Sequence, residues 1–309
     1  MRFFNLTAIM AAVAFATAAG PVRADERIEV VATFTILADL VRNVGGDRVE
    51  VTTLVGPNAD THVYTPSPSD ARKVATARLI VLNGLGLEGW LGRLVKSSGG
   101  AAQSVIASEG ITPLKPSHDD HDDHEHGHDH GHAHGDVDPH AWQSVSNVKR
   151  YVENIRRALA EADPAGAETY RANAERYATR LDALDQEIRS TVARIPEDRR
   201  KVISTHEAFD YFAKAYGIRF VAPQGVSTDS EPSARDVAAI IRQIKKEKIP
   251  AVFLENISDP RLIERIAAET GARIGGTLYS DSLTDEKGEA PTYIDMVKHN
   301  IRTIADALN

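Results

Sequence analysis

Apolar and polar positions follow two patterns along the chain, and the two patterns alternate in both halves. Short runs rich in valine and isoleucine have the length of buried strands, and the stretches between them have the spacing of amphipathic helices. This alternation predicts an α/β fold with two lobes, each built on a central, mostly parallel sheet flanked by helices. The expected strands are 28–33, 49–55, 79–82, 201–205, 218–222, 251–255 and 273–279, and the expected helices are 37–44, 68–77, 208–216, 233–247 and 260–270.

A longer helical pattern separates the two sets of elements. An apolar stripe recurs at steps of three and four residues from a start near Pro164 to a stop at Pro196. About 30 residues at a rise of 1.5 Å give a rod of roughly 45 Å, long enough to run along both lobes. We therefore expect a first lobe at 25–163, a linking helix at 164–196 and a second lobe at 197–309. Two lobes joined by a rigid helix should hinge less than lobes joined by flexible strands. The stripe consists of Tyr170, Ala174, Tyr177, Leu181, Leu184, Ile188, Val192 and Ile195.

The first 24 residues have the pattern of a secretory signal peptide. Arg2 precedes a mostly apolar stretch at 3–19, and small residues stand at the third and first places before a cut after Ala24. The apolar stretch is shorter than the roughly 20 residues that a spanning helix needs. Since no cysteine follows that could carry a lipid, we expect an unanchored protein in a periplasm.

Composition narrows the chemistry. The chain has 309 residues and a net charge of −8, which argues against a general affinity for nucleic acid or anionic lipid. Cysteine is absent, which excludes disulfides, thiolate nucleophiles and zinc sites built on sulfur. Any zinc must therefore be held by histidine, aspartate or glutamate.

Eight of the twelve histidines lie in one tract at 118–134, inside a loop expected at 116–137. The tract mixes imidazoles with carboxylates and has no apolar period, so we expect it to be disordered and solvated. Short His-rich tracts bind metal, but a flexible chain does not preorganise one tight site. We expect several weaker, exchangeable zinc ions there, as an auxiliary to a tight site elsewhere. The eight residues are His118, His121, His124, His126, His128, His130, His132 and His134.

Three of the other histidines and one aspartate share a context. His62, His206 and Asp281 each follow a predicted strand. His140 lies in a loop before a helix that begins near Val145. Ligands collect outside the carboxyl ends of strands in parallel α/β sheets, so these four side chains could meet in a cleft. Three imidazoles and one carboxylate suit tetrahedral zinc better than magnesium or calcium, and manganese prefers more carboxylate.

Each of these residues competes with an ordinary structural role. A lone histidine after a strand is more often a hydrogen-bonded loop or cap residue than a ligand, so the prediction depends on the four together. His299 keeps the ordinary role, because we expect it on an outward-facing C-terminal helix beside Lys298 and Asn300.

Two motif matches carry less weight. The segment 124–128 fits the metalloprotease pattern H-E-x-x-H, but a tract of histidines, acids and glycine produces that match by chance. The segment 84–89 fits the dinucleotide pattern G-x-G-x-x-G after a strand, with Glu109 about twenty residues further on. That unit is not the first strand and helix of the fold, and a secreted protein meets little dinucleotide. We therefore expect no nucleotide cofactor.

A series of motifs in a fixed order carries a family resemblance over nearly the whole chain after the leader. The motifs are Gly56-Pro57 with Asp60 and His62, 66–70, Asn83-Gly84 with Glu88 and Trp90, 138–142, 204–209 with 211–213 and Tyr216-Gly217, and 281–283. With them the chain resembles the zinc and manganese solute-binding proteins of bacterial ABC importers, cluster A-I, and specifically their zinc-binding branch.

The resemblance implies two α/β lobes joined by a long helix, with one metal ion between them. It also implies delivery to a membrane permease driven by a cytoplasmic ATPase, and a periplasmic zinc chaperone stays open as a further partner. The family's metal ligands fall on His62, His140, His206 and Asp281. Manganese members usually lack an acidic His-rich loop and often carry Glu at the position of His206, so both differences indicate zinc.

Three acidic residues are candidates for partners that orient the ligands. Asp60 and Glu255 could hold imidazoles through their second ring nitrogen, although a helix cap and a strand-end salt bridge are equally good roles for them. Glu207 directly follows His206, so a shift of one residue in register would exchange the two.

We expect a monomer that binds one Zn(II) tightly and catalyses no reaction. Since binding needs neutral imidazoles, the affinity should fall as the pH drops through about 6.5. A secreted zinc hydrolase is the alternative from another class, with three protein ligands, an open water position and Glu207 or Glu255 as the base. A manganese-binding member of the same family and an adhesin that happens to bind metal are further alternatives.

Overall fold

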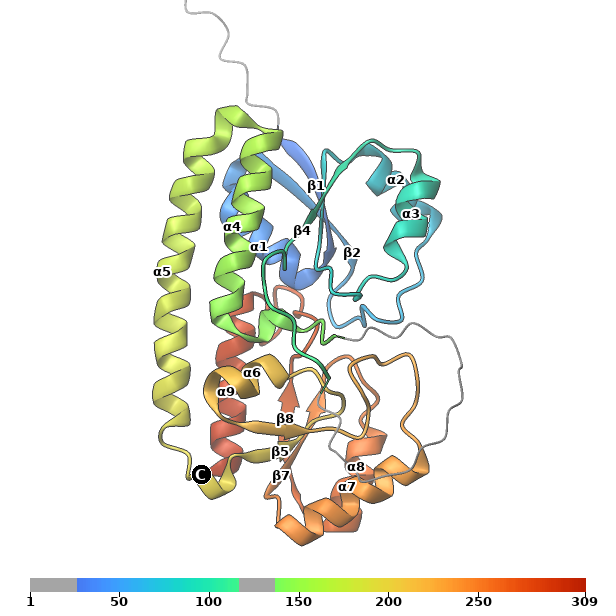
Figure 1. The fold of residues 1–309 in the computed structure, drawn as a ribbon, viewed down its shortest axis with the longest axis vertical. Coiled ribbons are helices and arrows are strands. Elements are labelled where there is room, and N and C mark those ends of the chain that lie inside the picture. Colours follow the sequence, from blue (N-terminus) through green and yellow to red (C-terminus); the bar gives the residue numbers. More distant parts are fainter. Residues whose placement is uncertain (1–26, 117–136) are drawn as a thin grey trace, which may run out of the picture.

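The computed structural model describes residues 27–116 and 137–309, which form two α/β lobes joined by one long helix (Figure 1). The predicted signal peptide and the histidines of the 118–134 tract lie outside the described residues. A four-stranded sheet forms the centre of each lobe, and every strand pair in the two sheets is parallel. The predicted fold class is therefore confirmed.

The first sheet has the strand order β2-β1-β3-β4, with β1 hydrogen-bonded on both sides. Val30 and Val31 at its centre are buried. A parallel strand covered on both faces needs a nearly continuous apolar run, which explains the runs of valine and isoleucine in this half. The elements are β1 (Ile28–Phe34), α1 (Thr35–Gly45), β2 (Val49–Val55), α2 (Pro68–Thr76), β3 (Leu79–Leu82), α3 (Leu91–Ser98) and β4 (Gln103–Ile106).

The second sheet repeats this topology in the order β6-β5-β7-β8. Ile203 and Val252 of its central strands pack with Ile240 and Ile263 of two covering helices in an apolar cluster of their own. The elements are β5 (Lys201–Ile203), α6 (Asp210–Tyr216), β6 (Arg219–Val221), α7 (Ala234–Glu247), β7 (Ala251–Glu255), α8 (Arg261–Thr270), β8 (Arg273–Leu278) and α9 (Tyr293–Leu308).

A layer of helices runs along one side of both lobes and includes α4 (Val145–Ala162), α5 (Ala167–Val192) and α9 (Figure 1). The 26 residues of α5 span about 39 Å, and its predicted stripe is buried from Tyr170 to Val192. The helix begins later than the pattern predicts because Pro164–Gly166 forms a separate 3-10 turn. It contacts α1 of the first lobe and α9 of the second, so it joins the two lobes.

The hydrophobic pattern misses α3 and β4. The residues of β4 are exposed or half-buried at the edge of the sheet, and α3 buries only Leu91 and Leu94, so neither has a strong apolar signal. The expectation that the C-terminal helix faces outward is wrong. Asn300 of α9 is 3% exposed, and its amide exchanges hydrogen bonds of 2.7 and 2.9 Å with the backbone of Tyr279.

The lobes are fastened together on the side of the helical layer. The rings of Phe34 and Trp142 lie 5.1 Å apart in a core that continues from one lobe into the other. The Trp142 indole donates a 2.9 Å hydrogen bond to the carbonyl of Ser280, and the Tyr293 hydroxyl donates one of 2.8 Å to the carbonyl of Trp142. Among the helices of the described ranges, none is both long enough and apolar enough to cross a bilayer.

Candidate metal centre

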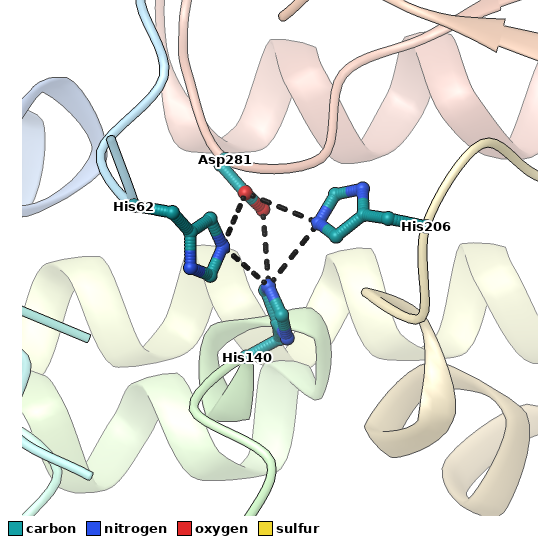
Figure 2. A group of neighbouring side chains, drawn as sticks. All are labelled: His62, His140, His206 and Asp281. Atoms are coloured by element: carbon teal, nitrogen blue, oxygen red, sulfur yellow. Dashed lines mark hydrogen bonds and ion pairs between the residues drawn. The ribbon is translucent and has the colours of Figure 1, made fainter. Parts of the chain in front are cut away.

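Four side chains from both lobes meet at the seam between the lobes (Figure 2). His62 lies in the loop that follows β2, and His140 lies in the turn before α4. His206 lies in the bend that follows β5, and Asp281 comes three residues after β8. The structure thus brings together the four residues that the strand-end argument selects, two from each lobe.

The potential ligand atoms of this group approach one another closely. His62 Nε2 lies 3.2 Å from His140 Nε2 and 3.1 Å from Asp281 Oδ2. His206 Nε2 lies 3.3 Å from each of the same two atoms. Zinc–donor bonds of about 2.0–2.1 Å in tetrahedral geometry require donor–donor edges of about 3.3–3.4 Å. Four of the six separations between the four atoms are therefore close to a tetrahedral edge, and all four atoms lie within 4.8 Å of one another.

The centre is almost completely removed from solvent. The side chains of His140, His206 and Asp281 are 0% exposed, whereas that of His62 is 4% exposed. Burying three ring nitrogens and a carboxylate next to one another is costly unless protons or a cation compensate them. The exposure of His62 also shows on which side the centre comes closest to solvent.

Asp138 orients the ring of His140. Its Oδ1 lies 2.7 Å from His140 Nδ1 and also accepts a 2.9 Å hydrogen bond from the backbone N–H of His140. A carboxylate can only accept, so this contact places the ring proton on Nδ1 and leaves the lone pair of Nε2 directed at the other donors. A metal-ligating histidine is typically held in this way.

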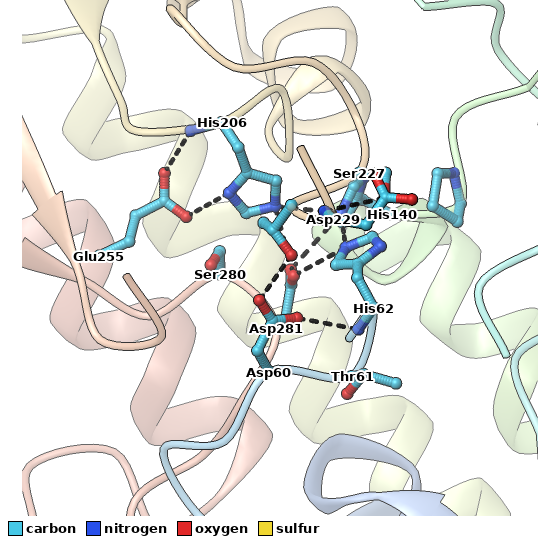
Figure 3. A network of polar contacts seen from close by, with 12 residues as sticks. Asp60, Thr61, His62, His140, His206, Ser227, Asp229, Glu255, Ser280 and Asp281 are labelled. Carbon is cyan, nitrogen blue, oxygen red and sulfur yellow. Dashed lines mark hydrogen bonds and ion pairs between the residues drawn. The ribbon is translucent and has the colours of Figure 1, made fainter. Parts of the chain in front are cut away.

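Glu255, at the end of β7, does the same for His206 (Figure 3). Its Oε2 lies 2.6 Å from His206 Nδ1. Its Oε1 accepts backbone hydrogen bonds from Thr205 at 2.7 Å and from His206 at 3.0 Å. Glu255 therefore lies where the prediction placed it, against the second nitrogen of an imidazole.

The other two predicted partners lie differently. Asp60 accepts a 2.8 Å hydrogen bond from the backbone N–H of His62, so it supports the turn that carries the ligand and not its ring. Its second oxygen accepts a 2.5 Å hydrogen bond from the hydroxyl of Thr228 in the other lobe. Glu207 lines a cavity beside the centre, and the group of four ligand-type atoms contains His206 in its place.

The electrostatics of the centre favour a cation. Burial alone lowers the pKa of His140, but the carboxylates of Asp281 and Asp138 outweigh it and raise this pKa to about 9. Burial also lowers the pKa of His206, and Glu255 and Asp281 raise it well above its ordinary value. Burial raises the pKa of Asp281, yet the two imidazoles hold it well below its ordinary range. An incoming metal ion must therefore displace protons from the centre.

A buried polar network positions the segment that carries His140. The amide of Asn83 donates a 2.9 Å hydrogen bond to the carbonyl of Pro139, and the Tyr151 hydroxyl fixes that amide with a 2.5 Å bond to its oxygen. Glu88 accepts hydrogen bonds from the backbone N–H groups of Asn83 and Gly84 at 2.7 and 3.1 Å. Glu88 thus occupies the N–H group of Gly84, the first glycine of the G-x-G-x-x-G segment, with the chain's own carboxylate.

The sequence patterns predict no role for Asp138, Asn83 or Thr228. For Asp138 the signal is present, because an aspartate stands two residues before a candidate histidine both at 60–62 and at 138–140. In both places the aspartate accepts the hydrogen bond of the histidine's backbone N–H. No comparable local pattern marks Asn83 or Thr228, whose partners lie 56 and 168 residues away.

Comparison with known proteins gives a consistent result over nearly the whole chain. Residues 30–307 match the family model described as zinc-uptake complex component A, periplasmic. The chain is 38% identical over 280 residues to the iron-binding protein YfeA of Yersinia pestis, covering 91% of this chain and 86% of that protein. It is 34% identical over 314 residues to the manganese-binding lipoprotein MntA of Bacillus subtilis, covering 97% of this chain and 98% of that protein.

Solved structures agree with the fold described above. The periplasmic zinc-binding protein TroA of Treponema pallidum superimposes with a TM-score of 0.82 at 32% identity, covering 91% of this chain and 99% of that one. The manganese-bound periplasmic metal-binding protein of Candidatus Liberibacter asiaticus superimposes with a TM-score of 0.79 at 29% identity, covering 92% and 100%.

Proposed function

Because the chain belongs to the family of periplasmic zinc-uptake components, solute-binding proteins of ABC transporters, we propose that it captures one Zn(II) ion tightly and delivers it to a zinc importer. Its place in metal uptake implies a membrane permease and a cytoplasmic ATPase as partners. The histidines of the 118–134 tract would bind further zinc ions more weakly and raise the concentration of zinc near the centre.

The observation that carries this proposal is the convergence of His62, His140, His206 and Asp281 on one buried point. Contacts of Asp138 and Glu255 with the Nδ1 atoms of two of these histidines direct their Nε2 lone pairs inward. Each lobe supplies two of the four donors, so an ion bound there would be held between the lobes.

The donor set supports zinc. Three imidazole nitrogens and one carboxylate oxygen at tetrahedral spacing are typical of zinc sites, and zinc imposes no preference for a higher coordination number. Manganese-binding members of the family that the chain resembles usually lack an acidic His-rich loop and often carry Glu at the position of His206. Both features of this chain therefore favour zinc. TroA, with a TM-score of 0.82, is a zinc-binding relative.

A second metal class also has support. YfeA and MntA, two relatives above 30% identity, are named as iron-binding and manganese-binding. Asp281 Oδ1 is buried without a hydrogen-bond partner and lies 3.6 Å from His140 Nε2, so both oxygens of this carboxylate can reach an ion. A fifth donor of this kind suits the larger coordination numbers of Mn(II) and Fe(II).

Affinity alone does not separate these metals, since zinc binds N/O sites more tightly than manganese or iron(II) in general. The deciding test is the growth of cells that lack this gene, in media depleted of one metal at a time. If zinc is the cargo, the mutant fails in zinc-depleted medium and zinc, but not manganese or iron, restores growth. A defect confined to manganese or iron depletion would overturn the zinc assignment.

The hydrolase alternative has less support. The candidate base Glu255 already contacts His206 Nδ1 and accepts two backbone hydrogen bonds, so it does not face the centre as a base for water. Asp281 supplies a fourth donor at the position that a catalytic zinc keeps open. The family consists of transporter components and not of enzymes, which supports a non-enzymatic role.

A further inference from the structure

The metal centre comes closest to solvent beside His62, the one ligand in the group of four whose side chain is not fully buried. A cavity of about 460 Å³ is lined by Asp60, two residues before the ligand His62 in the chain, and by Thr205, the residue before the ligand His206. Thr228 lines the same cavity. Asp60 and Thr228 therefore both lie in the wall of a cavity next to the turn that carries His62.

The carboxylate of Asp60 bridges the two lobes at this place. One oxygen accepts the backbone N–H of His62 at 2.8 Å, and the other accepts the hydroxyl of Thr228 at 2.5 Å (Figure 3 shows the first contact). The hydrogen bond to Thr228 is partly buried and connects residues 168 positions apart. The backbone of His62 is thus linked to the second lobe through Asp60, in addition to the 3.1 Å contact of its ring with Asp281.

Thr228 belongs to the β6–α7 loop, residues 222–233, whose other end is attached beside His206. The backbone N–H of Glu207 donates to the carbonyls of Gln224 and Gly225 at 3.1 and 3.3 Å, and His206 and Gln224 form an isolated parallel bridge. The loop therefore extends from the ligand of one lobe to the carboxylate that supports the ligand of the other lobe.

Apart from the contacts of the four ligands with one another, further contacts between the lobes lie away from Thr228. The His62 loop is tied to the second lobe earlier in its course, where the N–H of Asn58 donates to the carbonyl of Leu283 at 3.0 Å. The helical side is fastened by Trp142 and Tyr293. Opening a packed core on that side requires far more than breaking one hydrogen bond, so motion at the centre is easiest at the β6–α7 loop.

We propose that the Thr228–Asp60 hydrogen bond holds the metal centre closed on its exposed side and sets the rate at which the bound ion leaves. This inference deepens the proposed function, on which it rests. The bond exists only when the loop lies against the first lobe, so it slows dissociation and has little effect on the encounter with the ion. Thr228 acts through Asp60 on the turn of His62 and is a positioning residue, not a ligand.

The test uses the whole mature chain loaded with Zn²⁺, mixed rapidly with an excess of a chromogenic chelator to record the dissociation rate. Thr228→Val removes the hydroxyl and keeps the branched shape, whereas Thr228→Ser keeps the hydroxyl. We expect zinc to leave the valine variant about tenfold faster, because a hydrogen bond to a charged acceptor is lost. The serine variant should stay close to the unaltered protein, and the association rate should change little in either.

Ser227→Ala is the matched control, because this substitution removes the hydroxyl next to Thr228 in the same loop. That hydroxyl donates to Asp229 at 2.9 Å and not to Asp60. Zinc dissociation from this variant should remain unchanged. Equal rates of zinc dissociation from the Thr228→Val variant and the unaltered protein would overturn the proposal. The proposal would also fail if Ser227→Ala accelerated dissociation as much as Thr228→Val, because that result would indicate a general loosening of the loop. A chain that binds no zinc at all would instead refute the proposed function.

Discussion

Carboxylates serve the centre in two ways at the scale of single residues. Asp281 faces the three Nε2 atoms, while Asp138 and Glu255 contact the opposite ring nitrogens. Asp281 supplies negative charge opposite a bound ion, whereas Asp138 and Glu255 select the imidazole tautomer whose Nε2 can bind the ion. A neutral replacement of an outer carboxylate should therefore weaken binding without removing a ligand.

Glu255→Gln tests this role. The glutamine oxygen can still accept the backbone N–H groups of Thr205 and His206, but its amide nitrogen cannot accept the proton of His206 Nδ1. We expect zinc affinity to fall about 10- to 100-fold, measured by competition with a chelator of known affinity. The matched control is Glu207→Gln, one residue after His206, which should leave the affinity unchanged. A loss of affinity in Glu207→Gln but not in Glu255→Gln would show that Glu207 takes the place of His206 as a ligand, a shift of one residue in register.

The raised pKa of His140, about 9, moves the expected pH dependence of binding upward from the 6.5 of an ordinary imidazole. Its folded pKa is above its unfolded value, so protonation stabilises the metal-free protein fully below pH 6.5, and this contribution is lost as the pH rises to 9. Zinc must displace that proton, so affinity should rise across the same window. The difference in melting temperature between zinc-loaded and metal-free protein should widen from pH 6.5 to 9, and a constant or narrowing difference would contradict this.

At the scale of elements, the strand ends place the ligands and the buried network keeps them in place. Strands β2, β5 and β8 each fall within a strand expected from the sequence, and each ends shortly before one of the donors. The strand-end rule therefore finds three donors from the sequence. The support of the fourth, His140, depends on Asn83 and Tyr151, whose contacts arise from tertiary packing and have no local signal.

Asn83→Ala tests this support. It removes the hydrogen bond to the Pro139 carbonyl and leaves the Tyr151 hydroxyl without its partner, so we expect zinc affinity to fall together with stability. Asn154→Ala is the control, because this equally buried amide of α4 donates to the carbonyls of Ala107 and Glu109, away from the segment of His140. It should lower the melting temperature and keep zinc affinity. A similar loss of affinity in both variants would assign Asn83 a merely structural role.

At the scale of the whole molecule, the long helix and the shared core oppose a large movement of the lobes. The apolar stripe of α5 predicts this helix from the sequence, because a period of three to four over 26 residues has no other explanation. What the stripe does not predict is the depth of the contact between the lobes, which depends on Trp142, Tyr293 and other residues distant in the chain.

The scattering profiles of zinc-loaded and metal-free protein should therefore nearly superimpose. The contacts of α5 with α1 and α9 hold both lobes along one rod, so binding should change loops and not the distance between the lobes. Small-angle X-ray scattering in the presence and absence of zinc measures this directly. A clear decrease in the radius of gyration on zinc binding would contradict the rigid-rod account.

The central claim is that one ion is bound by His62, His140, His206 and Asp281, independently of the His-rich tract. Calorimetric titration with Zn²⁺ of the chain from residue 25, with residues 118–134 deleted, tests it most directly, alongside the same variant carrying His206→Ala. The account predicts one tight equivalent of zinc in the first protein and its loss in the second. Loss of tight binding on deletion of the tract alone, or its survival in the His206→Ala variant, would contradict it.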